Sequence, residues 1–238
     1  DLPLGDPTPP RPVATARYDL YWAWSLQYSN HSWIMLIDSR DTYFQLDPFQ
    51  SVVKNTHDSG NNLESGLLYF FGENKEARNL STSSFNLNWL HHAYGAEKIQ
   101  SFKEEVIVCS GSTMGEKIAI ESYLRAMILQ YDETKCNDKG CDQGFHNYLY
   151  HAHILDNGTG IKDVVLFQQG HGIINNLGAL RDKPLLDQGL INADTTEVLN
   201  WDKSVSAVAH QFDRDPTLNR FVNQKRKELK NWKALERK

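Results

Sequence analysis

The sequence is poor in cysteine, in long apolar runs and in positive charge, and each shortage argues against a class of protein. Of its three cysteines, only Cys136 and Cys141 lie close together in the sequence, and this pair alone offers too few ligands for a zinc site. No apolar run approaches the roughly 18 residues that a membrane span requires. The formal net charge of −5 argues against a nucleic-acid-binding protein. With 40% hydrophobic residues, the 238-residue chain can still bury the core of one sizeable domain.

Proline is concentrated at the start of the chain. Five of the eight prolines fall within residues 1–12, a density typical of a stiff, extended segment. We therefore interpret residues 1–13 as a leader or linker and residues 14–222 as the folded domain. Residues 223–238 are rich in lysine and arginine and are predicted to form a basic C-terminal helix. Such a helix could contact an acidic membrane or partner, although a solvated terminal helix explains it better.

Short apolar runs alternate with amphipathic segments along the domain. This alternation is typical of an α/β fold with a mostly parallel sheet flanked by helices. Strands are predicted at residues 33–37, 67–71, 106–108, 164–167, 197–199 and 205–208. Helices are predicted at residues 14–28, 86–94, 114–131 and 142–151, and from residue 217 onward.

Two aspartates, Asp38 and Asp41, directly follow the apolar run of residues 33–37. The carboxyl end of a buried strand lies at the edge where open α/β sheets bind ligands. Two carboxylates at this spacing can share one hard divalent cation, which phosphate oxygens and water would complete. A polar loop with a surface ion pair between Arg40 and Asp41 explains the spacing equally well.

The sequence around this motif resembles a known family. Residues 38–41, followed by Phe44-Gln45 and by residues 47–49, are similar to a group of eukaryotic and algal-virus glycosyltransferases of the GT-A type. In these proteins an apolar strand runs into an aspartate-rich metal motif. The likeness extends to about residue 220 and is carried by further blocks at residues 109–115, 142–148, 157–160, 198–200 and 210–214.

The resemblance implies a GT-A-like, Rossmann-related fold and a metal-dependent reaction. Asp38, Asp41 and a late histidine, His210, would hold Mn²⁺ or Mg²⁺, which acts as a Lewis acid on a diphosphate leaving group. Arg40 would pair with phosphate or hold Asp38 in place. The substrates would be a nucleotide-diphosphate sugar and a glycan or glycoprotein acceptor. From the residues alone, His210 is better explained as a capped or core histidine.

Ser110, Gly111 and Ser112 belong to a segment that lines the donor-sugar pocket in the resembling family. The residues themselves predict a bend between a strand and a helix. Backbone N–H groups at such a helix N-terminus suit anionic or hydroxyl-rich ligands. Capping of the helix by Ser112 or Thr113 is the purely structural alternative.

Asp142 and Gln143 open the helix predicted at residues 142–151, and His146 follows one turn later. An aspartate in the first turn of a helix is favoured electrostatically without any ligand. In GT-A enzymes, however, an acidic residue near this point contacts the transferred sugar or activates the acceptor. Asp142 is therefore our candidate general base for an inverting enzyme, and Asp142 or Gln143 would orient the sugar in a retaining one. His146 is a secondary candidate, with burial in the core as an equal alternative.

The position of the metal motif departs from the family pattern. GT-A domains begin with a strand that holds the nucleotide base, well upstream of this motif. Here the motif follows one predicted helix, so we expect the base-binding part to be absent or to come from an upstream domain or a partner chain. The alternative function is then a non-catalytic, glycosyltransferase-derived module of a larger extracellular or organellar assembly. A metal-dependent hydrolase is disfavoured because the sequence pairs no nucleophile with a base.

The cysteines and the three N-glycosylation sequons give information on the cellular compartment. Cys136 and Cys141 enclose a turn-rich loop and could close a small disulfide, which would leave Cys109 as a buried thiol. Together with the resemblance, the sequons favour the secretory pathway, in particular the Golgi lumen, or the extracellular space. The sequons begin at Asn30, Asn79 and Asn157.

Overall fold

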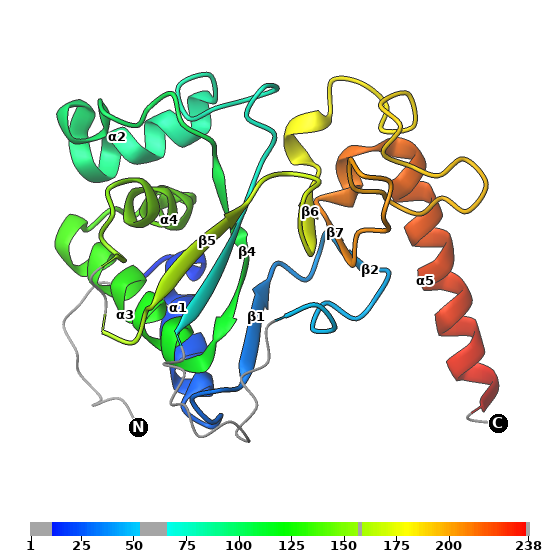
Figure 1. The fold of residues 1–238 in the computed structure, drawn as a ribbon, viewed down its shortest axis with the longest axis horizontal. Helices are drawn as coiled ribbons and strands as arrows, with labels where there is room; N and C mark the ends of the chain where they lie inside the picture. The colour runs from blue at the N-terminus through cyan, green and yellow to red at the C-terminus, as the bar shows by residue number, and fades with distance from the viewer. Residues whose placement is uncertain (1–10, 53–65, 157–158, 237–238) are drawn as a thin grey trace.

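The computed structural model describes residues 11–52, 66–156 and 159–236. This part of the chain is α/β, with two mixed sheets and flanking helices (Figure 1). The arrangement is compatible with a Rossmann-related fold. The sequon at Asn157 and most of the proline-rich segment lie outside the described residues. No helix within them is long and apolar enough to cross a membrane.

The first sheet has the strand order β1-β4-β3-β5. Antiparallel pairing joins β4 to both of its neighbours, whereas β3 and β5 are parallel. The prediction of a mostly parallel sheet is therefore wrong, and the sheet is mixed. Its strands are β1 (Trp33–Ile37), β3 (Leu67–Gly72), β4 (Val108–Glu116) and β5 (Asp163–Phe167).

The path between β3 and β4 explains why β4 is reversed. Gly72, at the end of β3, lies opposite Val108, at the start of β4. The backbone N–H of Glu73 donates to the carbonyl of Ile107 (2.8 Å). The intervening segment, with helix α2 (Ser84–Ile99), thus returns the chain to the edge where β3 ends. β4 runs back from there, while β1, β3 and β5 all end at this edge, the side at which open sheets bind ligands.

A second, smaller sheet has the strand order β2-β7-β6. Its strands β2 and β6 are absent from the sequence prediction, because three residues are too few to show a periodic pattern. The strands predicted at residues 197–199 and 205–208 contribute mainly isolated bridges, and β7 begins at the last of these residues. The strands are β2 (Thr42–Phe44), β6 (Ile174–Asn176) and β7 (Val208–His210).

Four helices lie on one side of the first sheet (Figure 1). The alternation of side chains along β3 sends Leu68 and Phe70 to the helix side and Tyr69 and Phe71 to a second core on the opposite side. Besides α2, these helices are α1 (Val13–Ser25), α3 (Lys117–Thr134) and α4 (Cys141–His151). Two short 3₁₀ turns, Gly178–Leu180 and Phe212–Arg214, flank the smaller sheet.

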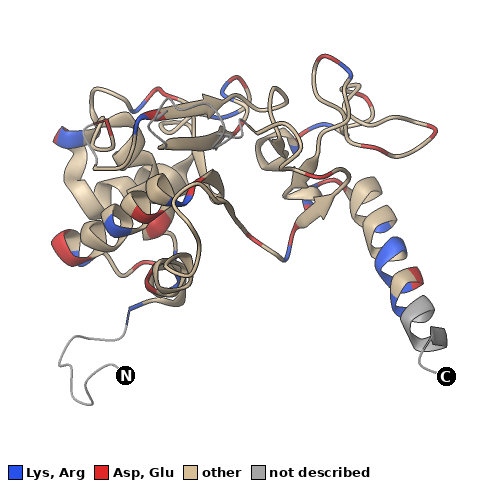
Figure 2. Cartoon of the chain, turned by 60° about the horizontal axis from the view of Figure 1, so that its bottom comes forward, with Lys and Arg blue, Asp and Glu red and all other residues tan. Residues whose placement is uncertain are grey.

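The last helix, α5 (Pro216–Glu236), leaves the smaller sheet and runs away from the body of the protein (Figure 1). Its first turns are anchored because Leu218 and Val222 are buried in the core beside that sheet. Residues 223–230 of the helix are exposed and include basic residues (Figure 2).

The three cysteines have two different states. Cys136 and Cys141, the first residue of α4, form a disulfide, as the sequence allowed. Cys109 is a buried free thiol on β4. Burial raises the pKa of Cys109 above its ordinary value, so the thiol stays protonated at neutral pH.

Candidate metal centre

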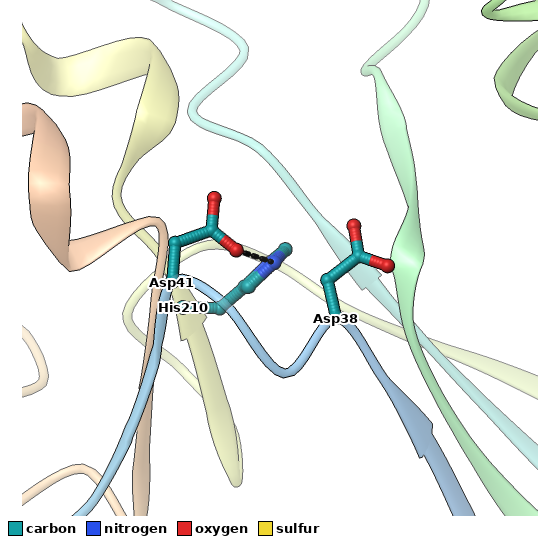
Figure 3. Close-up of side chains that lie close together, drawn as sticks. All are labelled: Asp38, Asp41 and His210. Carbon is teal, nitrogen blue, oxygen red and sulfur yellow. Dashed lines mark ion pairs between the residues drawn. The ribbon is translucent and has the colours of Figure 1, made fainter. Parts of the chain in front are cut away.

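Asp38, Asp41 and His210 meet where the two sheets adjoin (Figure 3). Asp38 follows β1, and residues 38–41 cross from the first sheet to β2 of the second. Thr42, the first residue of β2, pairs with His210 at the end of β7. One potential ligand atom from each of the three side chains lies within 4.8 Å of the other two.

His210 is only 1% exposed, and one of its ring nitrogens is held by Asn176. The Nδ1 atom of His210 lies 2.8 Å from the side-chain oxygen of Asn176. The amide nitrogen of Asn176 donates to the carbonyls of Phe71 (2.9 Å) and Gly72 (3.3 Å), which fixes the orientation of the amide. Nδ1 is therefore the protonated nitrogen, and Nε2 keeps its lone pair, as in a metal-binding histidine with a second-shell partner.

The Nε2 atom of His210 is buried and has no hydrogen-bond partner within the described residues. Its near neighbour is Oδ1 of Asp41, at 3.7 Å. Burial lowers the pKa of His210, and the carboxylates of Asp41 and Asp38 oppose this shift without reversing it. A neutral imidazole whose free lone pair faces two carboxylates has the chemistry of a divalent-cation site.

The two aspartates play different parts in this cluster. Asp41 is buried, and its Oδ2 accepts a bond from the exposed Arg40 (3.0 Å). The ion pair that the sequence offered as an alternative to metal binding is therefore present and leaves Oδ1 facing His210. The side chain of Asp38 is 42% exposed. A cation held here would thus be enclosed by protein on the Asp41 side and reachable from solvent on the Asp38 side.

Gly111 keeps the space between Asp38 and His210 open. A Cβ atom at this position would lie 2.6 Å from Oδ2 of Asp38 and 2.9 Å from Cε1 of His210. The carbonyl of Gly111 also accepts the backbone N–H of Asp38 (2.9 Å), which ties the two strands together beside the cluster. Any side chain at this position would fill the space that a shared ion requires.

The segment around Gly111 is a strand, and the predicted bend is wrong. Residues 110–112 lie inside β4, four or more residues before α3 begins at Lys117. Their backbone groups therefore form no helix N-terminus. Ser112 is fully buried, and its hydroxyl lies 3.2 Å from the oxygen of Asn176 that also binds His210. Ser112 therefore lies on the Nδ1 side of His210.

Arg17 connects the cluster to the start of α4. One guanidinium nitrogen lies 2.5 Å from Oδ1 of Asp38, and the other lies 2.8 Å from Oδ2 of Asp142. The hydroxyl of Ser110 lies 3.4 Å from the same Asp142 oxygen. Burial raises the pKa of Asp142, and the charge of Arg17 opposes the shift. Arg17 thus links Asp142 to Asp38, and the role predicted for Asp142 toward a sugar stays a prediction.

Gln143 and His146 are directed elsewhere. The side-chain amide of Gln143 accepts the backbone N–H of Ser110 (2.8 Å) and donates to the carbonyl of Val108 (2.7 Å), so it serves the backbone of β4. His146 is 0% exposed, with its ring 4.3 Å from that of Phe70. The structure does not bring either side chain to the candidate metal centre.

Two residues of the site were not predicted from the sequence. Arg17 lies in a helix whose aromatic pattern indicated core packing, and an isolated arginine among aromatic residues was the available signal. Asn176 lies in the three-residue strand β6 and gave no signal. Both act on residues distant in the sequence.

Comparison of the sequence with protein-family models and with curated proteins finds no match. The functional argument therefore rests on the geometry of the site and on the resemblance of its motifs.

Proposed function

We propose that this chain is a metal-dependent glycosyltransferase domain of the GT-A type. It would move a sugar from a nucleotide-diphosphate donor to a hydroxyl of a glycan or glycoprotein. The observation that carries the proposal is the convergence of Asp38, Asp41 and His210, which the resemblance requires and the sequence alone does not. A bound Mn²⁺ or Mg²⁺ ion would supply positive charge to the departing diphosphate.

Each ligand residue has a distinct task in this proposal. Asp41 and His210 are buried and hold the ion from the protein side. Asp38 is open to solvent and faces the side from which a diphosphate would approach. Asn176 keeps the lone pair of His210 directed at the ion. The exposed guanidinium of Arg40, beside Asp41, is placed to pair with a phosphate group.

Asp142 is best suited to orient the donor sugar. Its carboxylate is already held by Arg17 (2.8 Å), which fixes its position before a donor arrives. A small cavity beside Asp38 is lined by Arg17, Tyr21, Ser110 and Gly111. The cavity is too small for a sugar ring, but a sugar hydroxyl entering it would meet Arg17, which is paired with Asp142.

The convergence supports the enzyme over a non-catalytic structural module. The disulfide between Cys136 and Cys141 and the sequons support a secretory location, the Golgi lumen or the extracellular space.

Calorimetric titration of UDP and of GDP, with and without Mn²⁺, tests the proposal. We expect one nucleotide to bind only when Mn²⁺ is present and to lose binding in Asp41→Asn. The matched control is Asp156→Asn, which changes an exposed aspartate paired with His153 and should bind like the wild type. Failure of both nucleotides to bind the folded chain, or equal binding in Asp41→Asn, would contradict the proposal.

A further inference from the structure

Two cavities adjoin His171, in the loop that follows β5. Each has a volume of 420 Å³, within the range of small-molecule sites. The first, which we call the Trp201 cavity, is lined by Glu73, Asn74, Lys75, Glu76, Gln168 and Trp201, among others. The second, the Tyr69 cavity, is lined by Asp47, Tyr69, Phe167, Asn200 and Asp202, among others. His171 lines both cavities, so the two are neighbours, and we refer to them together as the groove.

The ring of Trp201 is fixed before any ligand arrives. Its indole N–H donates to the backbone oxygen and to the side-chain oxygen of Gln169, both at 3.1 Å. The side chain of Gln169 is itself held by Asn74 (3.0 Å) and Asn175 (2.7 Å). Gly170, with a φ of +73°, lets the backbone lie against the ring, because a Cβ there would be 2.5 Å from it.

Trp201 nevertheless remains 37% exposed. A rigid aromatic ring that is open on one side binds a flat apolar face with little further loss of conformational freedom. The C–H face of a pyranose ring is such a face, and the hydroxyl groups around it need hydrogen-bond partners. The amides of Asn74 and Gln168 and the carboxyl group of Glu73 supply donors and acceptors in the same cavity.

The charge of the groove selects the kind of sugar. Among the described residues that line the two cavities, four carry carboxyl groups and one, Lys75, carries an amine that opposes them. Sulfated sugars and uronic acids would be repelled, whereas uncharged sugars would be accepted. Burial also raises the pKa of Glu73 to about 7, against the opposing charges of Arg181, Arg78 and Arg214. The carboxyl group can therefore either donate or accept a hydrogen bond near neutral pH. The four carboxyl groups belong to Asp47, Glu73, Glu76 and Asp202.

A short series of contacts links the Trp201 cavity to the candidate metal centre. Glu73 directly follows Gly72, whose carbonyl accepts a bond from the Asn176 amide that orients His210. Gln168 follows β5, so the cavity lies at the carboxyl edge where β1 and β3 also end.

We propose that the groove formed by the two cavities binds an uncharged oligosaccharide, with the ring of Trp201 as its stacking platform. The further proposal that this ligand is the acceptor of the transferase rests on the proposed function. Binding in the groove does not rest on it, because none of the three candidate metal ligands lines either cavity.

Nuclear magnetic resonance of protein labelled on tryptophan nitrogen tests this inference. The probes are neutral tetrasaccharides of glucose, galactose, mannose, xylose and N-acetylglucosamine, with a heparin tetrasaccharide as the charged comparison. We expect at least one neutral probe to shift the Trp201 indole signal and the heparin probe to leave it unchanged. Trp201→Ala should weaken that binding by about fivefold to tenfold, which a methyl signal in the groove would report.

Three variants make the outcome decisive. Trp201→Phe keeps an aromatic platform and should retain most of the affinity even if Trp201→Ala folds poorly. Trp24→Ala removes another exposed tryptophan, on α1, and should change nothing. Asp41→Asn should bind the probe like the wild type, so a failure of the proposed function would leave this result standing. Absence of binding by every neutral probe, or equal affinity of Trp201→Ala, would overturn the inference.

Discussion

Two buried histidines in this protein share the same local bonding. His210 is 1% exposed and His146 is 0% exposed. The Nδ1 atom of His210 is bonded to Asn176, and that of His146 lies 2.7 Å from the hydroxyl of Tyr123. In both rings Nε2 is buried without a hydrogen-bond partner among the described residues.

The surroundings of the two rings are opposite in character. The free nitrogen of His210 faces the carboxylates of Asp41 and Asp38 across a gap that Gly111 keeps open. The ring of His146 packs against Phe70 in the core between the helices and the first sheet. Burial and an unpartnered ring nitrogen therefore do not make a site by themselves. The groups that face the lone pair decide whether a histidine can bind a metal.

Replacing each histidine in turn should give the largest difference in Mn²⁺ affinity between two variants. We expect His210→Ala to weaken Mn²⁺ binding by more than about 100-fold, because even outer-shell partners of a metal contribute about 10- to 100-fold. His146→Ala should leave the affinity unchanged within about twofold. Calorimetric titration of Mn²⁺ into both variants provides the measurement. Equal losses in the two variants would remove the distinction between the two histidines.

The free energy of unfolding should fall in acid because His146 is buried in its neutral form. Burial, with smaller effects from His151 and Arg17, holds the pKa of His146 at about 3, below its ordinary 6.5. The unfolded chain binds a proton below about pH 6.5 that the folded chain does not. The contribution of His146 to the free energy of unfolding is therefore fully present above that pH. It is lost as the pH falls toward 3, at about 1.4 kcal/mol per pH unit.

Urea unfolding of the wild type and of His146→Gln at a series of pH values measures this contribution. Between about pH 6.5 and about pH 4.5, the wild type should lose about 2 to 3 kcal/mol more than the variant. Parallel curves for the two proteins would show that His146 is not held neutral by burial.

Closing the gap beside His210 should have a smaller effect. In Gly111→Ala the new methyl group would crowd Asp38 and His210, but the exposed side chain of Asp38 can swing outward. We therefore expect Mn²⁺ affinity to fall by about tenfold, or about 1.4 kcal/mol. Ser110→Ala, at the preceding position of β4, is the control and should bind Mn²⁺ normally. An unchanged affinity in Gly111→Ala would mean that the ion does not occupy this gap.

Part of the fold could be predicted from the sequence. The apolar runs at residues 33–37 and 67–71 predicted β1 and β3, because a buried strand is recognisable from its own residues. The direction of β4 could not be predicted in this way. It depends on α2 returning the chain to the edge where β3 ends, which is a property of tertiary packing.

The residues of the candidate site likewise fall into those that the sequence predicts and those that depend on tertiary packing. Asp38 and Asp41 were predicted from their place after a strand, and His210 only from the resemblance. Gln143 and His146 were overestimated, because the sequence does not show that their side of α4 faces β4 and the core. Arg17 was missed because it reaches Asp38 from another element of the fold.

The claim that Asp38, Asp41 and His210 hold one divalent cation is tested most directly by diffraction. Crystals of the wild type would be soaked in Mn²⁺, and data would be collected where manganese scatters anomalously. The account predicts an anomalous peak bonded to Nε2 of His210 and to carboxylate oxygens of Asp38 and Asp41. An empty cluster in crystals that bind manganese elsewhere, or that bind none, would contradict it.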